Sequence, residues 1–323
     1  MRRLSQLLLV LALALAAPAL ASAQCTFTTV GTTMYLDADC TTSSTILVPD
    51  GYTLDGNGFT ITAVDPSGDH FKGAVIKNAG WTAHVTNLTI TTSNLANACD
   101  AGGDRLRGIL FESASGTITH TTVFNLNQGA SGCQEGNAIE VRNAPFDGTH
   151  PNTQTVEILH NKLSSWQKTG IVANGDVSVR IAFNAVGASA TQENLAANSI
   201  QLGFGALGTV EHNDIAGNSW LGWSPTSDFA ATAVLVFDGG PGIVIQRNNI
   251  MEGNADVGIY FQANNGTVDN NRVFETGPDA GYDIGIGDYG TGNSVTNNKV
   301  RAYVMPYDGV VGGRNKTIPS PKD

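Results

Sequence analysis

The chain has 323 residues, of which 17 are Lys or Arg and 28 are Asp or Glu, so its formal net charge at pH 7 is −11. Only 14% of the residues are charged, whereas glycine occurs 38 times. The acidic surface disfavours binding to nucleic acids and to anionic membranes. It also disfavours an acidic polysaccharide as substrate, unless calcium bridges the two.

Residues 1–23 have the form of a secretory signal peptide. Arg2 and Arg3 precede the apolar run 7–15, and small residues at 21–23 offer a cleavage site. The apolar run is too short for a comfortable membrane span. We therefore expect a secreted, extracellular protein that is a monomer and is not inserted into a membrane.

Export would place all four cysteines in a compartment where disulfides form. Four cysteines allow three pairings, of which we favour Cys25–Cys40 and Cys99–Cys133. The cysteines lack the close spacing that is typical of a zinc site. The segment 24–45, tied by the first disulfide, is the expected N-terminal cap of the domain.

A repeated pattern organises the chain that follows. Eight segments share an apolar residue, two variable positions, a residue that is usually Asn, one more variable position and a second apolar residue. The shortest distance between successive segments is 23 residues, and longer distances reflect insertions. The first apolar residues are Val85, Ile118, Ile158, Ile181, Val210, Ile245, Val268 and Val295. The Asn column is Asn161, Asn184, Asn213, Asn248, Asn271 and Asn298.

A second strand recurs in each unit, rich in Val and Ile and bounded by Gly, Asn or Asp. Because alternate strand residues face opposite sides, one of its columns must point inward. That column is Ile109, Ile139, Ile171, Ile200, Val234, Ile259 and Ile284.

Strands that return in one register predict coils stacked about 4.8 Å apart. Asn tolerates left-handed turns, and stacked amides can bond from coil to coil. We therefore predict an all-β fold, a single-stranded right-handed parallel β-helix solenoid of about 9 coils. It should span residues 46–309, followed by a polar C-terminal tail at 310–323.

The segment ILVPDGYTLDGNGFTI (46–61) and the repeat resemble the right-handed parallel β-helix superfamily, which includes pectate lyases, polygalacturonases, and alginate lyases and epimerases. The segments NQGASGCQEGNAIEVRN and GGDRLRGI also resemble a group of exported bacterial β-helix proteins. The resemblance covers roughly residues 45–305 and implies the fold. It does not identify a reaction, because the polygalacturonase and pectate lyase catalytic motifs are missing. DPSGDH at 65–70 is only superficially similar to the Asp-Pro-His of mannuronan epimerases.

Three insertions, 95–107, 127–137 and 216–232, precede the second strand of their units and should wall one side of its outward face. Cys99 and Cys133 lie in successive insertions, so a disulfide between them would clamp two loops together. Clamped loops beside a rigid sheet suit a binding site, and they suit simple stability equally well.

Polar residues gather at outward positions of these strands. The third position is Leu110, Glu140, Val172, Gln201, Leu235 and Tyr260, and the fifth begins with Glu112 and Arg142. One interpretation is an ordinary surface ion pair between Glu112 and Arg142. The other is a sugar-binding cleft. Its candidate catalytic residues are Glu140, Lys168 and Arg142, and its candidate substrate-binding residues are Arg107, Glu112, Gln201, Trp220, Trp223, Asp228 and Tyr260.

Three activities could use such a set. In a lyase or epimerase, an arginine or a bound calcium would neutralise a uronate carboxylate, and Lys168 would be the base if its pKa is lowered. In an inverting glycoside hydrolase, Glu112 and Glu140 would act from roughly 8 Å apart. A non-catalytic glycan-binding or surface-structural protein is the third. We rank the polysaccharide lyase first, and expect Glu140→Gln and Lys168→Ala to abolish activity while leaving thermal unfolding nearly unchanged.

Other conspicuous residues favour packing over chemistry. His120, His160 and His212 share one column with Phe183, and no carboxylate joins them. An aromatic stack explains that column better than a metal site does. Trp220 and Trp223 either stack on a sugar ring or pack their loop onto the solenoid.

Overall fold

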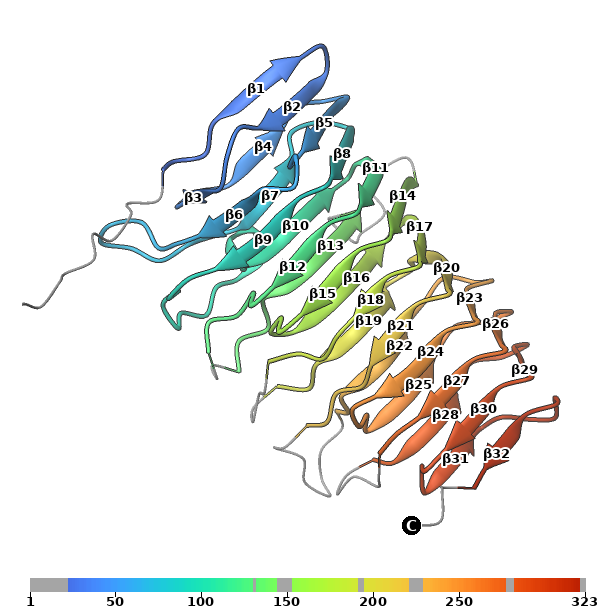
Figure 1. Cartoon of the computed structure of the whole chain (residues 1–323). Coiled ribbons are helices and arrows are strands. Elements are labelled where there is room, and N and C mark those ends of the chain that lie inside the picture. The colour runs from blue at the N-terminus through green and yellow to red at the C-terminus, as the bar shows by residue number, and fades with distance from the viewer. Residues whose placement is uncertain are drawn as a thin grey trace, which may run out of the picture.

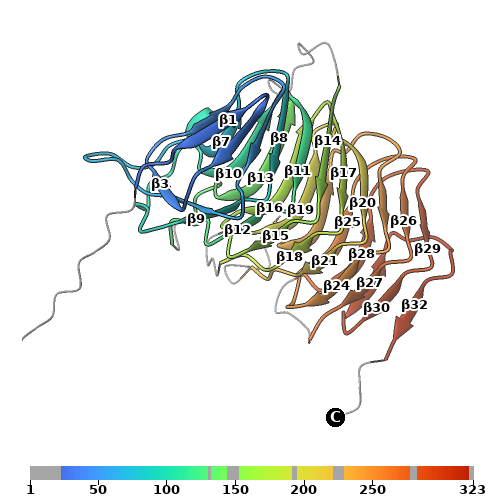
Figure 2. The same cartoon turned by 45° about the horizontal axis from the view of Figure 1, so that its top comes forward.

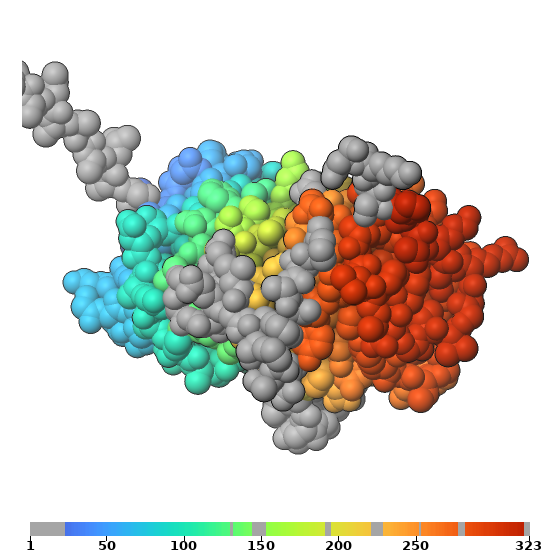
Figure 3. Space-filling view, turned by 90° about the horizontal axis from the view of Figure 1, so that it is seen from below, coloured from blue at the N-terminus to red at the C-terminus, as the bar shows by residue number. Residues whose placement is uncertain are grey.

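The computed structural model of the chain is a solenoid in which each coil contributes short strands to three sheets (Figure 1). Successive coils follow one another along the long axis, from the N-terminal to the C-terminal end (Figure 3). The structure describes residues 23–129, 132–143, 153–190, 195–220, 229–276 and 282–319. In these ranges no helix is long and apolar enough to cross a membrane.

The first sheet, sheet A, has 11 strands. In spatial order they are β3 (Cys40–Thr42), β6 (Thr60–Ala63), β9 (Thr89–Thr92), β12 (Thr122–Phe124), β15 (Lys162–Ser164), β18 (Ala185–Val186), β21 (Asp214–Ala216), β24 (Asn249–Glu252), β27 (Arg272–Phe274), β30 (Lys299–Arg301) and β32 (Lys316–Ile318).

Sheet B also has 11 strands. They are β1 (Phe27–Val30), β2 (Thr33–Leu36), β5 (Tyr52–Asp55), β8 (Thr82–Thr86), β11 (Ser115–Thr119), β14 (Gln154–Leu159), β17 (Val177–Ala182), β20 (Leu207–Glu211), β23 (Val244–Gln246), β26 (Thr267–Asp269) and β29 (Ser294–Thr296).

Sheet C has 10 strands. It contains the second recurring strand of each repeat unit, which carries candidate site residues. The strands of sheet C are β4 (Ile46–Val48), β7 (Ala74–Asn78), β10 (Arg107–Glu112), β13 (Asn137–Asn143), β16 (Thr169–Gly175), β19 (Asn198–Gly203), β22 (Thr232–Phe237), β25 (Val257–Phe261), β28 (Ile284–Asp288) and β31 (Met305–Asp308). A short 3₁₀ turn, Gly102–Asp104, precedes β10.

The strand pairs are parallel, except that β1 and β2 form an antiparallel hairpin at the N-terminal end. The predicted disulfide Cys25–Cys40 ties this hairpin to β3. The all-β parallel solenoid predicted from the sequence is confirmed. The polar segment 310–323 is not entirely a tail as expected, because Lys316–Ile318 (β32) pairs with β30 and adds a strand to sheet A.

The core is filled by the two predicted columns of Val and Ile. Except for Ile284, the members of both columns are 0–4% exposed and lie in one apolar cluster between the sheets. The last coil corrects one register: Ile286, and not Ile284, pairs with Ile259. The segment DIGIG alternates Ile and Gly, so a shift of two residues keeps the same faces and only the structure decides between them.

The Asn column forms a continuous ladder of buried amides between sheets B and A. The Nδ2 of Asn184 donates to the side-chain Oδ1 of Asn213 at 2.9 Å and to the carbonyl oxygen of Ile158 at 2.9 Å, and the other coils repeat this pair of bonds. Asn315, in the expected tail, ends the ladder by accepting from Asn298. The left-handed residue is not the ladder Asn, but the residue before it, such as His160 with φ 58°.

Candidate functional site

The outward residues of sheet C stand in the predicted register through β25. Glu140 on β13 pairs with Leu110 on β10 and Val172 on β16, and the row continues through Gln201 to Tyr260. Leu110 and Val172 are buried, although they lie outside the hydrophobic core. The face around Glu140 is therefore covered, and it is not the open cleft that the sequence suggests.

Charged side chains on β7, β10 and β13 form a chain of alternating ion pairs. Arg107 Nε donates to Glu140 Oε2 at 2.5 Å, and Arg142 Nη1 lies 3.6 Å from Glu140 Oε1. Arg142 Nη2 donates to Glu112 Oε2 at 2.6 Å, and Lys77 Nζ lies 3.6 Å from the same oxygen. Each carboxylate is thus shared by two cations.

Arg107 and Glu140 are the buried end of this chain, with side chains 2% and 5% exposed. The guanidinium of Arg107 also donates to carbonyl oxygens of the 102–105 turn, and Asn137 Nδ2 donates to Glu140 Oε2 at 2.8 Å. A buried ion pair with this many protein partners tolerates the loss of one member poorly. The geometry therefore favours a structural role for both residues, and the catalytic role of Glu140 stays a prediction.

Glu112 and Arg142 form the outer, less buried part of the chain. Burial raises the pKa of Glu112, but the hydrogen bond from Arg142 and the charges of Arg142, Lys77 and Arg107 outweigh it, so the pKa lies below its ordinary value. Glu112 is thus ionised at neutral pH. A carboxylate in that state accepts hydrogen bonds and cannot serve as a general acid.

Lys168 lies apart from these residues, just before β16. Its Nζ donates to the carbonyl oxygen of Ala196 at 2.5 Å, and burial lowers the pKa of the ammonium to about 8. Arg142 pairs with Asn174, which follows Lys168 by six residues, or about 20 Å of extended strand. The structure brings Glu140 and Arg142 together and places Lys168 near the opposite, N-terminal ends of the strands.

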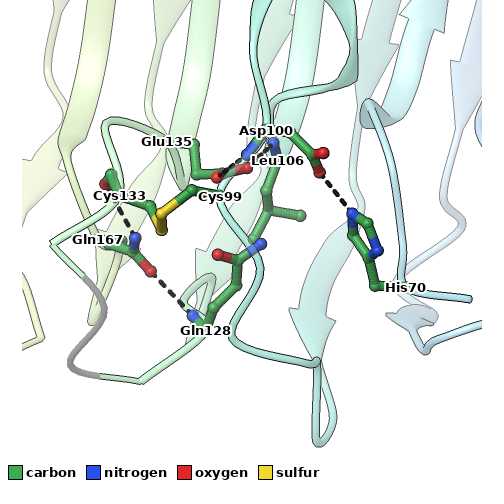
Figure 4. The surroundings of a disulfide bond; sticks show 8 residues. All are labelled: His70, Cys99, Asp100, Leu106, Gln128, Cys133, Glu135 and Gln167. Atoms are coloured by element: carbon green, nitrogen blue, oxygen red, sulfur yellow. Dashed lines mark hydrogen bonds and ion pairs between the residues drawn. A yellow bond between two sulfur atoms is a disulfide. The ribbon is translucent and has the colours of Figure 1, made fainter.

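The loops that precede β10 and β13 are clamped together (Figure 4). The predicted disulfide Cys99–Cys133 is present, and the buried carboxylate of Glu135 accepts the backbone N–H groups of Asp100 at 2.9 Å and Leu106 at 2.7 Å. These bonds cross between the two insertions. The clamp therefore fixes the 102–105 turn that holds Arg107.

The C-terminal half of the sheet C face carries aromatic and amide side chains. The rings of Phe204 and Phe237 meet edge to face with centroids 6.1 Å apart, and both are exposed. The rings of Tyr260 and Tyr289 lie 4.5 Å apart. We call these four residues the aromatic row. Beside it, three side-chain amides are hydrogen-bonded in series: Asn198 donates to Gln201 on β19, and Gln201 donates to Asn174 on β16.

Two details fix the tyrosine pair. A Cβ atom at Gly287 would lie 2.4 Å from the hydroxyl oxygen of Tyr289, so glycine leaves room for that ring. The Tyr289 hydroxyl donates to Asp308 Oδ2 at 3.0 Å. Burial, and then the charge of Tyr282, raises the pKa of Tyr260, so both tyrosines stay protonated near neutral pH and offer O–H donors.

Three members of the aromatic row were not predicted as site residues. Phe204 and Tyr289 follow the ends of β19 and β28, and Phe237 ends β22, so none stands in the third outward column. The available signal was an exposed aromatic residue at or just after the end of three sheet C strands, β19, β22 and β28. Tyr260 and Gln201, which were predicted, do lie on this part of the face.

The remaining tryptophan candidates are only partly placed. Trp220 packs against Phe229 with ring centroids 6.5 Å apart, and its backbone N–H donates to Asp256 Oδ1 at 3.2 Å. Phe229 is exposed. Trp223 and Asp228 lie outside the residues that the structure describes.

The histidine column is an aromatic stack, as predicted. His120, His160, Phe183 and His212 follow one another with ring centroids 5.2 Å apart. Within the described ranges, the one group of three close ligand atoms is that of Cys99, Cys133 and Glu135. Its sulfur atoms form the disulfide, and its carboxylate binds backbone N–H groups, so these atoms are already engaged.

The sequence of residues 149–313, about half of the chain, matches the family described as the right handed beta helix region. The chain belongs to this family. The parallel strands that lie in one register from coil to coil agree with it. Curated protein sequences give no significant match.

Similar solved structures share the fold at low identity. Two structures of the periplasmic alginate epimerase AlgG, a double and a single mutant, are each 12% identical. The double mutant covers 90% of this chain and 68% of its own with a TM-score of 0.42, and the single mutant covers 88% and 73% with 0.45. The A-module of the Azotobacter vinelandii mannuronan C-5 epimerase AlgE6 is 14% identical, covers 90% and 89%, and has a TM-score of 0.36. These likenesses concern the fold alone.

Proposed function

We propose that this β-helix protein binds and processes an extracellular polysaccharide on the outer face of sheet C. The aromatic row carries the proposal. Exposed rings next to amide and phenol donors are the combination that a sugar requires, because its C–H face packs on a ring while its hydroxyls bond the polar groups. The two disulfides support an oxidising compartment, in keeping with export.

Among reactions, a lyase-type elimination is the first to test. A hydrolase needs one protonated carboxyl group, but the pKa of Glu112 is lowered and Glu140 is tied to Arg107. Lys168, with a pKa of about 8, is the candidate base. Since Lys168 and Arg142 lie far apart along β13 and β16, Arg142 would bind a different sugar unit from the one that reacts.

The experiment incubates the protein with a panel of neutral and acidic polysaccharides, with and without calcium. New ultraviolet-absorbing unsaturated ends support the lyase, and new reducing ends without unsaturation would replace it by a hydrolase. Retention without turnover supports the glycan-binding alternative. Absence of any interaction across the panel would refute the proposal.

The binding face is tested separately with Phe237→Ala and Tyr260→Ala. Each should weaken glycan binding about 2- to 12-fold, because ring contacts are worth about 0.5–1.5 kcal/mol. Trp81→Ala is the matched control, since Trp81 is also an exposed aromatic residue but lies just before β8 of sheet B. Equal affinities for all three variants and the wild type would place the glycan elsewhere.

A further inference from the structure

The outer face of sheet A carries a second ordered column, separate from sheet C. Its strands lie side by side in one row from β12 to β32 (Figure 2). The register of the paired strands places one outward residue of each coil directly next to the corresponding residue of the following coil. The column runs Thr122, Lys162, Ala185, Asp214, Asn249, Arg272, Lys299, Lys316.

The middle of this column is hollowed. A groove of about 620 Å³ lies over β12 to β24, and its floor is made by small residues such as Ala185 and Gly187. A Cβ atom at Gly187 would lie 3.0 Å from the carbonyl oxygen of Leu163, so a side chain there would crowd the floor. Lys162 and Asp214 stand on either side of Ala185.

The groove walls are polar and suited to hydroxyl groups. Thr122, Ser164 and Lys162 offer hydroxyls and an ammonium, and Asn249 Nδ2 donates to Asp214 Oδ1 at 3.0 Å. Asp214 keeps its second oxygen as an acceptor. Alternating donors and acceptors along a shallow trough fit a sugar chain better than an apolar ligand.

The C-terminal end of the column is a ladder of three cations. Arg272, Lys299 and Lys316 occupy successive coils in direct Cα register. Like charges that stand directly opposite on neighbouring strands repel each other. A second hollow, of about 390 Å³, lies beside Lys299 and Lys316 and is also lined by Arg314.

These cations differ from four cations on the strands of sheets B and C. Lys77, Arg107, Arg142 and Arg180 each contact a carboxylate within 4 Å. In the described part of the chain, the three cations of the ladder have no such ion pair, although acidic residues outnumber basic ones by 28 to 17. Asp269, the acidic residue that lines the second hollow, is instead bonded by Thr296 and Asn297. The ladder is therefore kept positive in a negative protein.

We infer that the outer face of sheet A is a second glycan site, which binds an acidic polysaccharide lying along the solenoid axis. Anionic groups of successive sugars bind Arg272, Lys299 and Lys316, and the sugars that follow lie in the groove between Asn249 and Lys162. Coils repeat about every 4.8 Å, close to the length of one pyranose unit. One cation per coil therefore matches a chain that carries one anionic group per sugar.

This site does not depend on the sheet C proposal, and the test separates the two. Binding of polygalacturonate, dextran sulfate and neutral dextran is measured by calorimetry at two salt concentrations. The key variant is the triple change Arg272→Gln, Lys299→Gln and Lys316→Gln. The charge-matched control is Lys72→Gln, Arg180→Gln and Arg247→Gln, which removes three cations from other surfaces. A sheet C variant carries Phe237→Ala and Tyr260→Ala.

The ladder variant should lose at least about tenfold in affinity for an acidic polysaccharide, with a weaker salt dependence, because three exposed ion pairs are removed. The control triple should retain wild-type affinity. Preference for polygalacturonate or for dextran sulfate identifies carboxylate or sulfate as the anionic group. Equal binding by the two triple variants overturns the inference, even if the sheet C variant loses binding. Tighter binding of single-stranded polydeoxythymidine than of both acidic polysaccharides overturns it as well.

Discussion

The Arg107–Glu140 ion pair makes a sharp prediction about stability. Glu140→Leu would leave the guanidinium of Arg107, with its side chain 2% exposed, without its carboxylate partner. Removing one member of a buried ion pair costs about 3–5 kcal/mol. Because the carbonyl oxygens of the 102–105 turn still accept from Arg107, we expect the lower half of that range. The sequence alone predicts, in contrast, that Glu140→Gln leaves stability nearly unchanged.

Urea unfolding followed by circular dichroism measures this loss as a lower midpoint at constant slope. Glu157→Leu is the control. Glu157 faces Arg180 at 3.9 Å with its side chain 46% exposed, so its loss should cost at most about 1 kcal/mol. The double variant Arg107→Met with Glu140→Leu should recover most of the lost stability, because no unpaired charge remains. A loss below about 1 kcal/mol for Glu140→Leu, or a double variant as unstable as the sum of the single ones, would refute the reasoning.

Two further predictions concern the ladder and Lys168. Asn213→Ala removes bonds to Asn184, Ile181 and Asn248, so it should lower the free energy of unfolding in urea by about 3–6 kcal/mol. The control Asn249→Ala loses one exposed bond and should change it by at most about 0.5 kcal/mol. Equal losses for the two variants would contradict a stabilising role of the ladder. The folded pKa of Lys168, about 8, lies below its ordinary 10.5, so the folded state loses the proton first and wild-type stability should rise relative to Lys168→Met between those pH values. A stability difference that is constant with pH would show that the ammonium is not desolvated.

The fold was predictable because its signals are local and repeated. A strand period of two, one Asn per coil and spacings down to 23 residues each point to the same stacking. The one register error, at Ile284, arose where Ile and Gly alternate and a two-residue shift changes no face. The sequence predicts a tail where Asn315 and β32 lie, because a three-residue strand in a polar segment gives almost no pattern.

The candidate site was less predictable, for a different reason. A column tells which way a side chain points, but not what covers it. Glu140 does point outward, yet the 102–105 turn brings Arg107 over it, and that contact depends on loop geometry. The distance between Lys168 and Arg142 likewise depends on where each lies along its strand. Phe204 and Tyr289 stand just beyond their strands, where a count of strand positions ends.

The Asn ladder also gives the molecule a direction. In the bonds between side-chain amides, from Asn161 to Asn315, each amide donates to the one in the C-terminal coil and accepts from the one in the N-terminal coil. Reversing one amide would set donor against donor on one side and acceptor against acceptor on the other. The orientation of every amide is therefore fixed by its neighbours, and bonds aligned head to tail polarise one another. Within the ladder, only Asn161 and Asn315 lack an amide neighbour on one side. The ladder should therefore open first at these two amides, one beside β15 in the middle of the solenoid and the other at its C-terminal end.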